Sequence, residues 1–312
     1  MKEKIQYCIF DPTGNITALV ETAVDIADQP AAASRIMELE PDVEQVGFIS
    51  YAEDPEAGGV PVSLRMAGGE FCGNATMCAA ALFAIHKDLQ GGTAPVQIKV
   101  KVSGTTAPLT VSLERQDAFS FSSAVDMPPA LRIGTVNLQT SAAAGAVESG
   151  SAGETGAILS LPIVEMEGIS HIIIEPDSGF FGIKDDPAFA ESMLRNWCGV
   201  LGADCLGMMF LGEGEEFRPL TPLVYVPGAD TMFWENSCAS GSAAAGMYLA
   251  AKTGSPVDVT FEEPAGRFRV ESNPVNDPIN DPINDSTKGR TVLHGSVILR
   301  GSNQSASFNC DL

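Results

Sequence analysis

Residues 70–78 read EFCGNATMC, and residues 235–242 read ENSCASGS. In each stretch a cysteine, Cys72 or Cys238, follows an acidic residue and stands directly before a run of small residues. Both runs open alanine-rich segments whose residues favour a helix, and glycine follows each segment, as is typical of a helix end. The two stretches therefore predict two similar helices, each beginning at a cysteine.

The same order of elements follows both predicted helices. Alternating apolar and polar residues predict two strands after the first helix, at 96–102 and 109–114, and two after the second, at 257–263 and 268–272. This recurrence indicates a weak internal duplication. We therefore predict an α+β fold with two pseudo-symmetric lobes, each a mostly antiparallel sheet or barrel wrapped around a central helix.

The boundary between the predicted lobes falls near residues 120–130, where the first strand–turn–strand unit ends. We assign residues 1–125 to an N-terminal lobe that carries Cys72. Residues 126–312 form a C-terminal lobe that carries Cys238, with a final strand that can pack back on the first lobe.

Shorter patterns complete the predicted fold. Alternation around a turn at 11–15 predicts a hairpin, residues 29–40 predict a helix, and residues 44–50 predict a strand. A segment rich in Gly, Ser and Ala at 141–157 predicts a flexible surface loop. The repeated Asn-Asp-Pro-Ile unit at 276–289 predicts a surface insertion, because proline is excluded from central strands.

The composition restricts the class of partner. The chain has 312 residues, of which 45% are hydrophobic and 19% charged, as expected of a globular protein. A net charge of −22 repels phosphate backbones and anionic lipid, so neither nucleic acid nor a membrane is expected as a partner. No apolar run is long enough to span a bilayer, and the first residues lack a signal-peptide pattern. We expect a cytoplasmic protein.

The cysteines and glycines predict neither a metal site nor a bound cofactor. Seven cysteines, an odd number without a C-x-x-C pair, do not make a disulfide framework, and with only three histidines they do not suggest zinc. The nucleotide-binding patterns G-x-G-x-x-G and G-x-x-x-x-G-K-[ST] and the hydrolase pattern G-x-S-x-G do not occur.

A cysteine at a helix start can act as a base. The free backbone N–H groups and the helix dipole there stabilise an anion, and such placement lowers a thiol pKa from roughly 8.5 to about 3.5–7.5. The small residues after each cysteine, including Gly73, Asn74, Ser240 and Gly241, leave the N–H groups open to a carboxylate. Two such sites facing each other suit an α-carbon racemase, in which one thiolate removes the α-proton and the opposite thiol returns one.

Two other interpretations of the cysteines stay open on the residues alone. Both can be buried structural residues at helix starts, since free cysteine behaves as a small hydrophobe. They can also form a redox thiol pair, although the usual C-x-x-C spacing is absent.

Several segments, in the same order along nearly the whole chain, resemble the diaminopimelate epimerase superfamily of cofactor-independent, two-cysteine racemases. Within it the chain is most similar to the histidine racemases of staphylopine-type metallophore pathways. The similar segments are PTGNITALV (12–20), EQVGFI (44–49), EFCGNATM (70–77), KVSG (101–104), GMMF (207–210), PLVYVP (222–227) and WENSC (234–238).

The resemblance implies roles for individual residues. Cys72 and Cys238 match the two acid/base cysteines. Asn15 and Gln45 match positions that contact the substrate, and His171 matches a histidine beside the first cysteine. Four further residues match the backbone donors that hold the α-carboxylate: Gly73, Asn74, Ser240 and Gly241.

Glu44 and Glu235 are candidates to bind a positive charge of the substrate. Either carboxylate can accept a charge-assisted hydrogen bond from the α-ammonium or from an imidazole, although each can equally be a surface or capping residue. Glu70 fits a structural acid that complements the dipole at a helix start.

Departures from the epimerase pattern bear on the substrate. Diaminopimelate epimerases carry a Glu-Arg pair after the tyrosine that corresponds to Tyr225, whereas this chain has Val226 and Pro227. A second amino-acid head group would lack partners, so diaminopimelate is disfavoured. The resemblance implies interconversion of L- and D-histidine by a homodimer without a cofactor. A racemase of another amino acid and a non-catalytic small-molecule-binding homologue are the alternatives.

Overall fold

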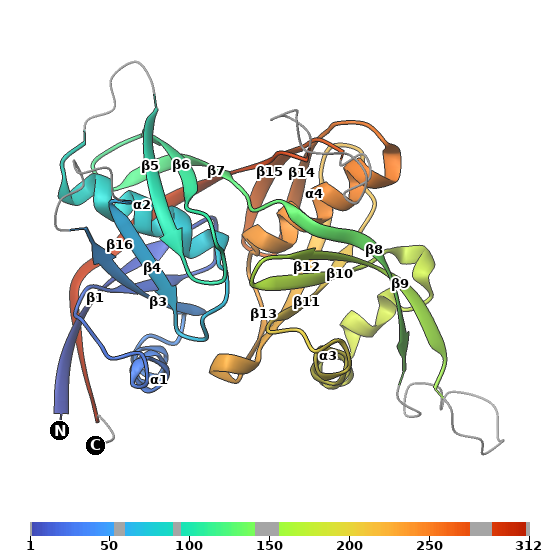
Figure 1. The fold of residues 1–312 in the computed structure, drawn as a ribbon, viewed down its shortest axis with the longest axis horizontal. Coiled ribbons are helices and arrows are strands. Elements are labelled where there is room, and N and C mark those ends of the chain that lie inside the picture. Colours follow the sequence, from blue (N-terminus) through green and yellow to red (C-terminus); the bar gives the residue numbers. More distant parts are fainter. Residues whose placement is uncertain (1, 53–59, 90–94, 141–155, 275–288, 310–312) are drawn as a thin grey trace.

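The protein folds into one continuous, strongly curved sheet with helices inside and outside it (Figure 1). The structure, a computed structural model, describes residues 2–52, 60–89, 95–140, 156–274 and 289–309. The predicted loop at 141–157 and the predicted insertion at 276–289 lie almost wholly outside these residues.

Eight strands close into a barrel. They follow the order β1-β2-β3-β4-β5-β6-β7-β16, and β16 pairs antiparallel with β1 to complete the ring. The barrel strands are β1 (Lys2–Asp11), β2 (Thr17–Val20), β3 (Gln45–Tyr51), β4 (Val62–Met66), β5 (Val96–Val102), β6 (Leu109–Arg115), β7 (Ser120–Asp126) and β16 (Thr291–Asn309).

The sheet continues from β16 into the second half of the chain. The order there is β16-β15-β14-β12-β11-β10-β9-β8, with β13 paired to β12. These strands are β8 (Ala130–Gln139), β9 (Ile158–Met166), β10 (Ile169–Ile174), β11 (Leu206–Leu211), β12 (Arg218–Val226), β13 (Thr231–Trp234), β14 (Val257–Glu263) and β15 (Gly266–Ser272).

Most strand pairs are antiparallel, as predicted; among the described strands the parallel pairs are β2–β3, β4–β5, β10–β11 and β12–β14. The final strand β16 pairs with β7 along one edge. Along its other edge it pairs with β15 near its start and with β1 further on, so it links the two halves of the molecule.

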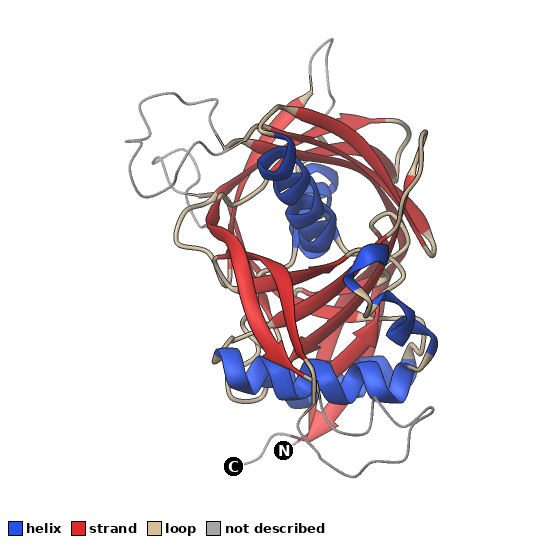
Figure 2. Cartoon of the chain, turned by 90° about the vertical axis from the view of Figure 1, so that its right-hand side faces the viewer, coloured by secondary structure: helices blue, strands red, loops and turns tan. Residues whose placement is uncertain are grey.

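Four α-helices lie in the described part of the chain. Helix α2 (Gly73–His86) contacts strands β2 to β7 and β16, and every residue from Gly73 to Ala84 is buried. Helix α4 (Ala239–Thr253) contacts strands β8 to β11 and β14 to β16. Both helices are apolar on all sides because strands surround them, and Figure 2 shows the strands curving around enclosed helices.

The other two helices cover outer faces of the sheet. Helix α1 (Gln29–Leu39) packs on β3 and β16, and helix α3 (Pro187–Leu201) packs on β11 and β12. Both lie at the bottom of Figure 1. Trp197 of α3 is fully buried in the core between this helix and the sheet.

The local predictions from the sequence are largely confirmed. β1 and β2 form the expected antiparallel pair, and the helix, strand, turn and strand after Cys238 appear as α4, β14 and β15. Helix α2 ends earlier than the Gly-Gly pair at 91–92 suggested. It stops at His86, and Asp88 adopts a left-handed φ of 46° that a helix cannot continue through.

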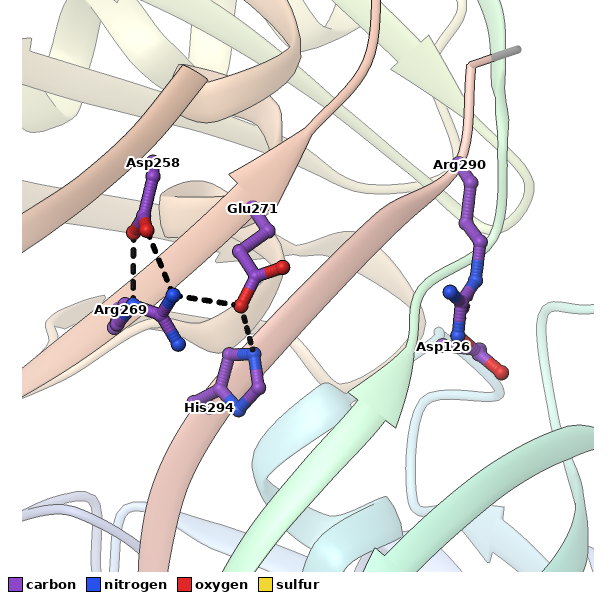
Figure 3. A network of polar contacts seen from close by, with 6 residues as sticks. All are labelled: Asp126, Asp258, Arg269, Glu271, Arg290 and His294. Carbon is purple, nitrogen blue, oxygen red and sulfur yellow. Dashed lines mark hydrogen bonds and ion pairs between the residues drawn. The ribbon is translucent and has the colours of Figure 1, made fainter. Parts of the chain in front are cut away.

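Charged side chains line the exposed surface of β14, β15 and β16. Arg269 donates hydrogen bonds to both carboxylate oxygens of Asp258, at 2.8 and 2.7 Å, and lies 2.8 Å from Glu271. Such exposed pairs each contribute little to stability. Figure 3 draws these contacts, in which His294 also lies 3.1 Å from Glu271, together with the separate pair of Arg290 and Asp126 at 2.6 Å.

Candidate active site

Both cysteines singled out in the sequence cap helices with nearly the same geometry. Cys72 is the N-cap of α2 with φ −133° and ψ 112°, and its Sγ accepts a hydrogen bond from Ala75 N at 3.3 Å. Cys238 is the N-cap of α4 with φ −130° and ψ 101°, and its Sγ accepts from Gly241 N at 3.4 Å. The predicted placement of both thiols at helix starts is therefore confirmed.

The two helix starts are in direct contact. A Cβ atom at Gly73 would lie 2.8 Å from Cβ of Ala239, so the close approach of α2 and α4 requires glycine there. Asn74 joins the helices, because its Oδ1 accepts from Ala239 N at 2.9 Å while its Nδ2 donates to Pro12 O at 3.1 Å. The fold thus brings together two segments far apart in the sequence.

Asn15 lies at the same junction. Its Nδ2 donates to Ser237 O at 2.8 Å, and its Oδ1 is buried without a hydrogen-bond partner. A buried acceptor without a hydrogen-bond partner is uncommon in a folded protein, and a bound ligand can supply the missing donor.

Burial dominates the protonation of both thiols. Cys72 is 5% exposed and Cys238 is 4% exposed. Burial raises the pKa of each thiol well above its ordinary value, and the helix N–H groups at Cys72 and the Ser240 hydrogen bond at Cys238 lower it only partly. The expectation of a lowered thiol pKa is wrong for this closed arrangement, because desolvation of the thiolate outweighs these hydrogen bonds.

Gln45 connects Cys72 to a buried carboxyl group. The Cys72 thiol donates a short hydrogen bond to Gln45 Oε1, and Gln45 Nε2 donates to Glu235 Oε1 at 2.7 Å. Burial raises the pKa of Glu235 to about 8, with the neighbouring Glu44 and Glu70 charges adding to the effect. The second oxygen of Glu235, Oε2, is buried without a conventional hydrogen-bond partner, and the Glu235 carboxyl group also acts on the Cys238 thiol, whose pKa it raises.

A small cleft of about 40 Å³ opens beside these residues. Three carboxylates line it, from Glu44, Glu70 and Glu235, together with Gln45. Glu44 accepts a hydrogen bond from Asn236 N at 3.1 Å, and Glu70 Oε2 is buried and unpaired. The other described lining residues are Pro30, Ala33, Ser34, Met37, Val46, Ala67, Val224, Val226, Ala229, Thr231 and Phe233, so the described lining contains no positive charge.

His171 contacts the first turn of the helix that follows the second cysteine. Its Nε2 lies 3.0 Å from Ser240 Oγ, and that hydroxyl lies 3.5 Å from Cys238 Sγ. The position beside Cys72 that the resemblance implies stays a prediction, and the hydrogen-bond partner of the ring belongs to the first turn of α4. Burial lowers the pKa of His171 to about 3, so the ring is neutral at physiological pH.

Gly241 is required by packing as well as by its position after Cys238. A Cβ atom there would overlap Sδ of Met209 and lie 3.2 Å from Cys238 Sγ. The backbone at Gly241 therefore approaches the thiol with no room for a side chain.

Two acidic residues of this region were not assigned to the site from the sequence. Glu70 was expected to be structural, and it lines the cleft. Glu263 was not considered; it is 5% exposed and contacts the start of α4. The burial of Glu263 could have been predicted from the sequence. Alternate residues of a strand point to the same face, and Glu263 lies two residues after the buried Phe261.

The comparison with known families identifies the chain. A family described as "Histidine racemase CntK N-terminal domain" matches residues 4–295, almost the whole length. The chain belongs to this family.

Two bacterial proteins named histidine racemase have similar sequences. A histidine racemase of Staphylococcus aureus is 28% identical over 275 residues, which cover 87% of this chain and 89% of that protein. A histidine racemase of Fusobacterium nucleatum is 29% identical over 261 residues, covering 80% and 83%. These matches agree with the resemblance noted in the sequence.

Solved structures share the fold. A probable proline racemase of Agrobacterium radiobacter superposes with a TM-score of 0.64 at 12% identity, covering 98% of this chain and 93% of that one. A hydroxyproline epimerase of Agrobacterium vitis gives 0.61 at 10% identity, covering 99% and 93%. This member of the histidine racemase family is therefore an isomerase of the racemase and epimerase class, with a small-molecule amino-acid substrate.

In the described part of the chain, no helix is both long and apolar enough to cross a bilayer. Within those same residues, no group of three or more His, Cys, Asp or Glu side chains is arranged to hold a metal ion.

Proposed function

We propose that the protein interconverts L- and D-histidine without a cofactor, using Cys72 and Cys238 as the two acid/base groups. The observation that carries the proposal is the contact between the two helix starts, at Gly73 and Ala239, each directly after a capping cysteine. Histidine is the substrate named for the relatives of the chain.

The proposed reaction is a proton transfer at Cα from one face to the other. One cysteine, as the thiolate, takes the α-proton and becomes a thiol. The other cysteine, as the thiol, delivers its proton to the opposite face and becomes the thiolate. One proton enters and one leaves, so the product is the mirror image and the two cysteines have exchanged protonation states.

The substrate carboxylate is proposed to bind at the two helix starts. Backbone N–H groups at Gly73, Asn74, Ser240 and Gly241 are the donors, and the two helix dipoles favour the negative charge that develops as Cα loses its proton. The side chain of Asn74 already bridges the two halves, so its role in binding falls to its backbone N–H.

The positive groups of histidine are proposed to bind Glu235, Glu44 and Gln45. Glu235 has a buried oxygen without a partner, and the described lining of the cleft carries carboxylates but no basic side chain. An incoming ammonium group would be stabilised there and would in turn favour a nearby thiolate, offsetting the effect of burial on the thiol pKa. The same described lining offers no basic side chain for the distal carboxylate of diaminopimelate.

Asn15 and His171 complete the proposed site. Asn15 presents its unpaired Oδ1 at the junction of the two halves. His171, neutral and bound to the Ser240 hydroxyl, holds the first turn of α4 beside Cys238.

A cleft of about 40 Å³ is far too small for an amino acid, since it holds only about three waters. We infer that the two halves separate to admit the substrate and close around it. In this proposal residues 1–125 and 126–312 are the moving lobes, pseudo-symmetric units each built around a central helix, with β16 crossing between them. A homodimer in the cytoplasm remains part of the same proposal.

The test is proton NMR of the purified, reduced protein in D2O with each common L-amino acid and no added cofactor. Loss of the α-proton signal of histidine alone is the expected result. Exchange in another amino acid would retain the mechanism and discard histidine. Absence of exchange in every amino acid, diaminopimelate included, would leave a non-catalytic binding homologue and overturn the proposal.

A further inference from the structure

Glu263 is a buried acid in direct contact with the start of helix α4. It is the last residue of β14 and is 5% exposed. Its Oε2 accepts a hydrogen bond from Cys238 N at 2.5 Å, and its Oε1 accepts a short hydrogen bond from the Ser242 hydroxyl. A carboxylate oxygen of Glu263 thus holds the backbone N–H of the capping cysteine itself.

The first helix lacks this arrangement. Ser242 stands four residues after Cys238, and the residue in the same position after Cys72 is Thr76. Thr76 Oγ1 donates to the backbone carbonyl of Cys72 at 2.6 Å instead of to a carboxylate. The two cysteines therefore share a capping geometry, but a buried carboxyl group binds the backbone at Cys238, and none of the described contacts places one at the backbone of Cys72.

The N-terminus of helix α4 stabilises a negative charge on either the Glu263 carboxylate or the Cys238 sulfur. The positive end of α4 favours a negative charge, and both the Glu263 carboxylate and the Cys238 thiolate lie against it. A negative charge on Glu263 and one on the Cys238 thiolate would repel each other, because both groups are buried and little water screens them. Burial raises the pKa of Glu263 well above its ordinary value, so this acid ionises only as the pH rises. Burial also raises the pKa of Cys238, and the charges of Glu235 and Glu263 raise it further.

Other charged and titratable groups also face Cys238. Glu235 precedes it in the chain, and its charge raises the pKa of the thiol. His171, from β10, reaches Cys238 through the Ser240 hydroxyl and is neutral. Glu263 is the one of these groups that binds the backbone of Cys238.

We propose that Glu263 is a positioning residue that makes the two cysteines unequal: it fixes the capping backbone of Cys238 and, when ionised, keeps Cys238 in its thiol form. At pH values where Glu263 is ionised, Cys238 is then the proton donor, and Cys72 is the cysteine that becomes the base first. This assignment of roles rests on the proposed two-cysteine function, whereas the electrostatic coupling of Glu263 to Cys238 does not.

The experiment measures the reactivity of each thiol across a pH range. The full-length, reduced protein is treated with iodoacetamide at a series of pH values, and the alkylation rates of Cys72 and Cys238 are read separately from their peptides by mass spectrometry. Glu263→Gln keeps an acceptor for Cys238 N and a donor for Ser242 but removes the charge. We expect the rate at Cys238 at a fixed pH below its midpoint to rise about tenfold or more, with the profile of Cys72 unchanged.

Glu262→Gln is the matched control. Glu262 is the preceding residue of the same strand, is exposed, and pairs with Arg267 on the surface at 2.5 Å. This variant should leave both alkylation profiles as in the wild type. A Glu263→Gln protein that is folded by circular dichroism but has an unshifted Cys238 profile would overturn the proposal.

If Glu263→Gln does not fold, Ser242→Ala tests the same coupling. It removes the hydroxyl that stabilises the Glu263 charge, so the Cys238 rate should again rise, and an unchanged rate refutes the coupling. α-Proton exchange of histidine is measured on the same samples. A shifted Cys238 profile without exchange in the wild type would retain the coupling and reject the racemase function, so the two failures are distinguishable.

Discussion

Replacement of Glu235 by glutamine should change how stability depends on pH. Glu235 is 4% exposed, and Gln45 is the donor to its Oε1. Burial raises its pKa from 4.5 to about 8, and the charges of Glu44 and Glu70 act in the same direction. The folded protein therefore holds this proton more tightly than the unfolded chain does.

The direction of the effect follows from proton linkage. Below pH 4.5 Glu235 is protonated in both states and its contribution is complete. Between pH 4.5 and about 8 the unfolded chain loses the proton while the folded protein keeps it, so the free energy of unfolding falls as pH rises. Each pH unit in this window amounts to about 1.4 kcal/mol, so the full loss is at most about 5 kcal/mol and is complete above about pH 8.

The assay is urea denaturation of the wild type and of Glu235→Gln at pH 5 and pH 8.5. The variant cannot ionise, so its stability relative to the wild type should increase by several kcal/mol between the two pH values. Contributions from other titrating groups are common to both proteins and largely cancel in this difference.

Glu213→Gln provides the control, because Glu213 lies exposed in the loop between β11 and β12. Its stability relative to the wild type should be nearly the same at both pH values. If the difference between Glu235→Gln and the wild type is also independent of pH, the reasoning about Glu235 is refuted.

Further predictions concern the helix starts. Cys72→Ser and Cys238→Ser should each lower histidine racemisation by at least about 10²–10⁴-fold, because serine is a very weak base; chiral chromatography measures this, and near-normal turnover in both variants contradicts the two-base mechanism. His171 should remain neutral from pH 5 to 8 because burial lowers its pKa to about 3; its ring-proton NMR signals should stay constant, and a titration near pH 6.5 would count against this environment. Gly241→Ala should destabilise the protein by about 1–3 kcal/mol through overlap with Met209; an unchanged urea midpoint would show that the core accommodates the methyl group.

The elements of the fold follow closely from the sequence. The alanine-rich runs after Cys72 and Cys238 predicted two helices, because alanine favours a helix, and Gly254 ends α4 as expected. Alternation at 257–263 and 268–272 predicted β14 and β15 within a residue or two. These signals are local, since each depends only on neighbours within one or two turns of a helix or along one strand.

Closure of the barrel could not be predicted in the same way. β16 pairs with β1 across nearly the whole length of the chain, and no local pattern specifies a partner so far away. The parallel pairs, such as β4 with β5, likewise join strands that are separated by a helix in the sequence, so no local pattern specifies them.

The sequence by itself determined which residues could do the chemistry, because cysteines at helix starts and an acid three residues before Cys238 are visible as letters. Only the tertiary structure decided how these groups behave. Whether a thiol pKa rises or falls depends on how much water packing removes, and here burial outweighs the helix start at both cysteines. The same is true of Glu263: its strand was predictable, but its contact with Cys238 N arises only when β14 packs against α4.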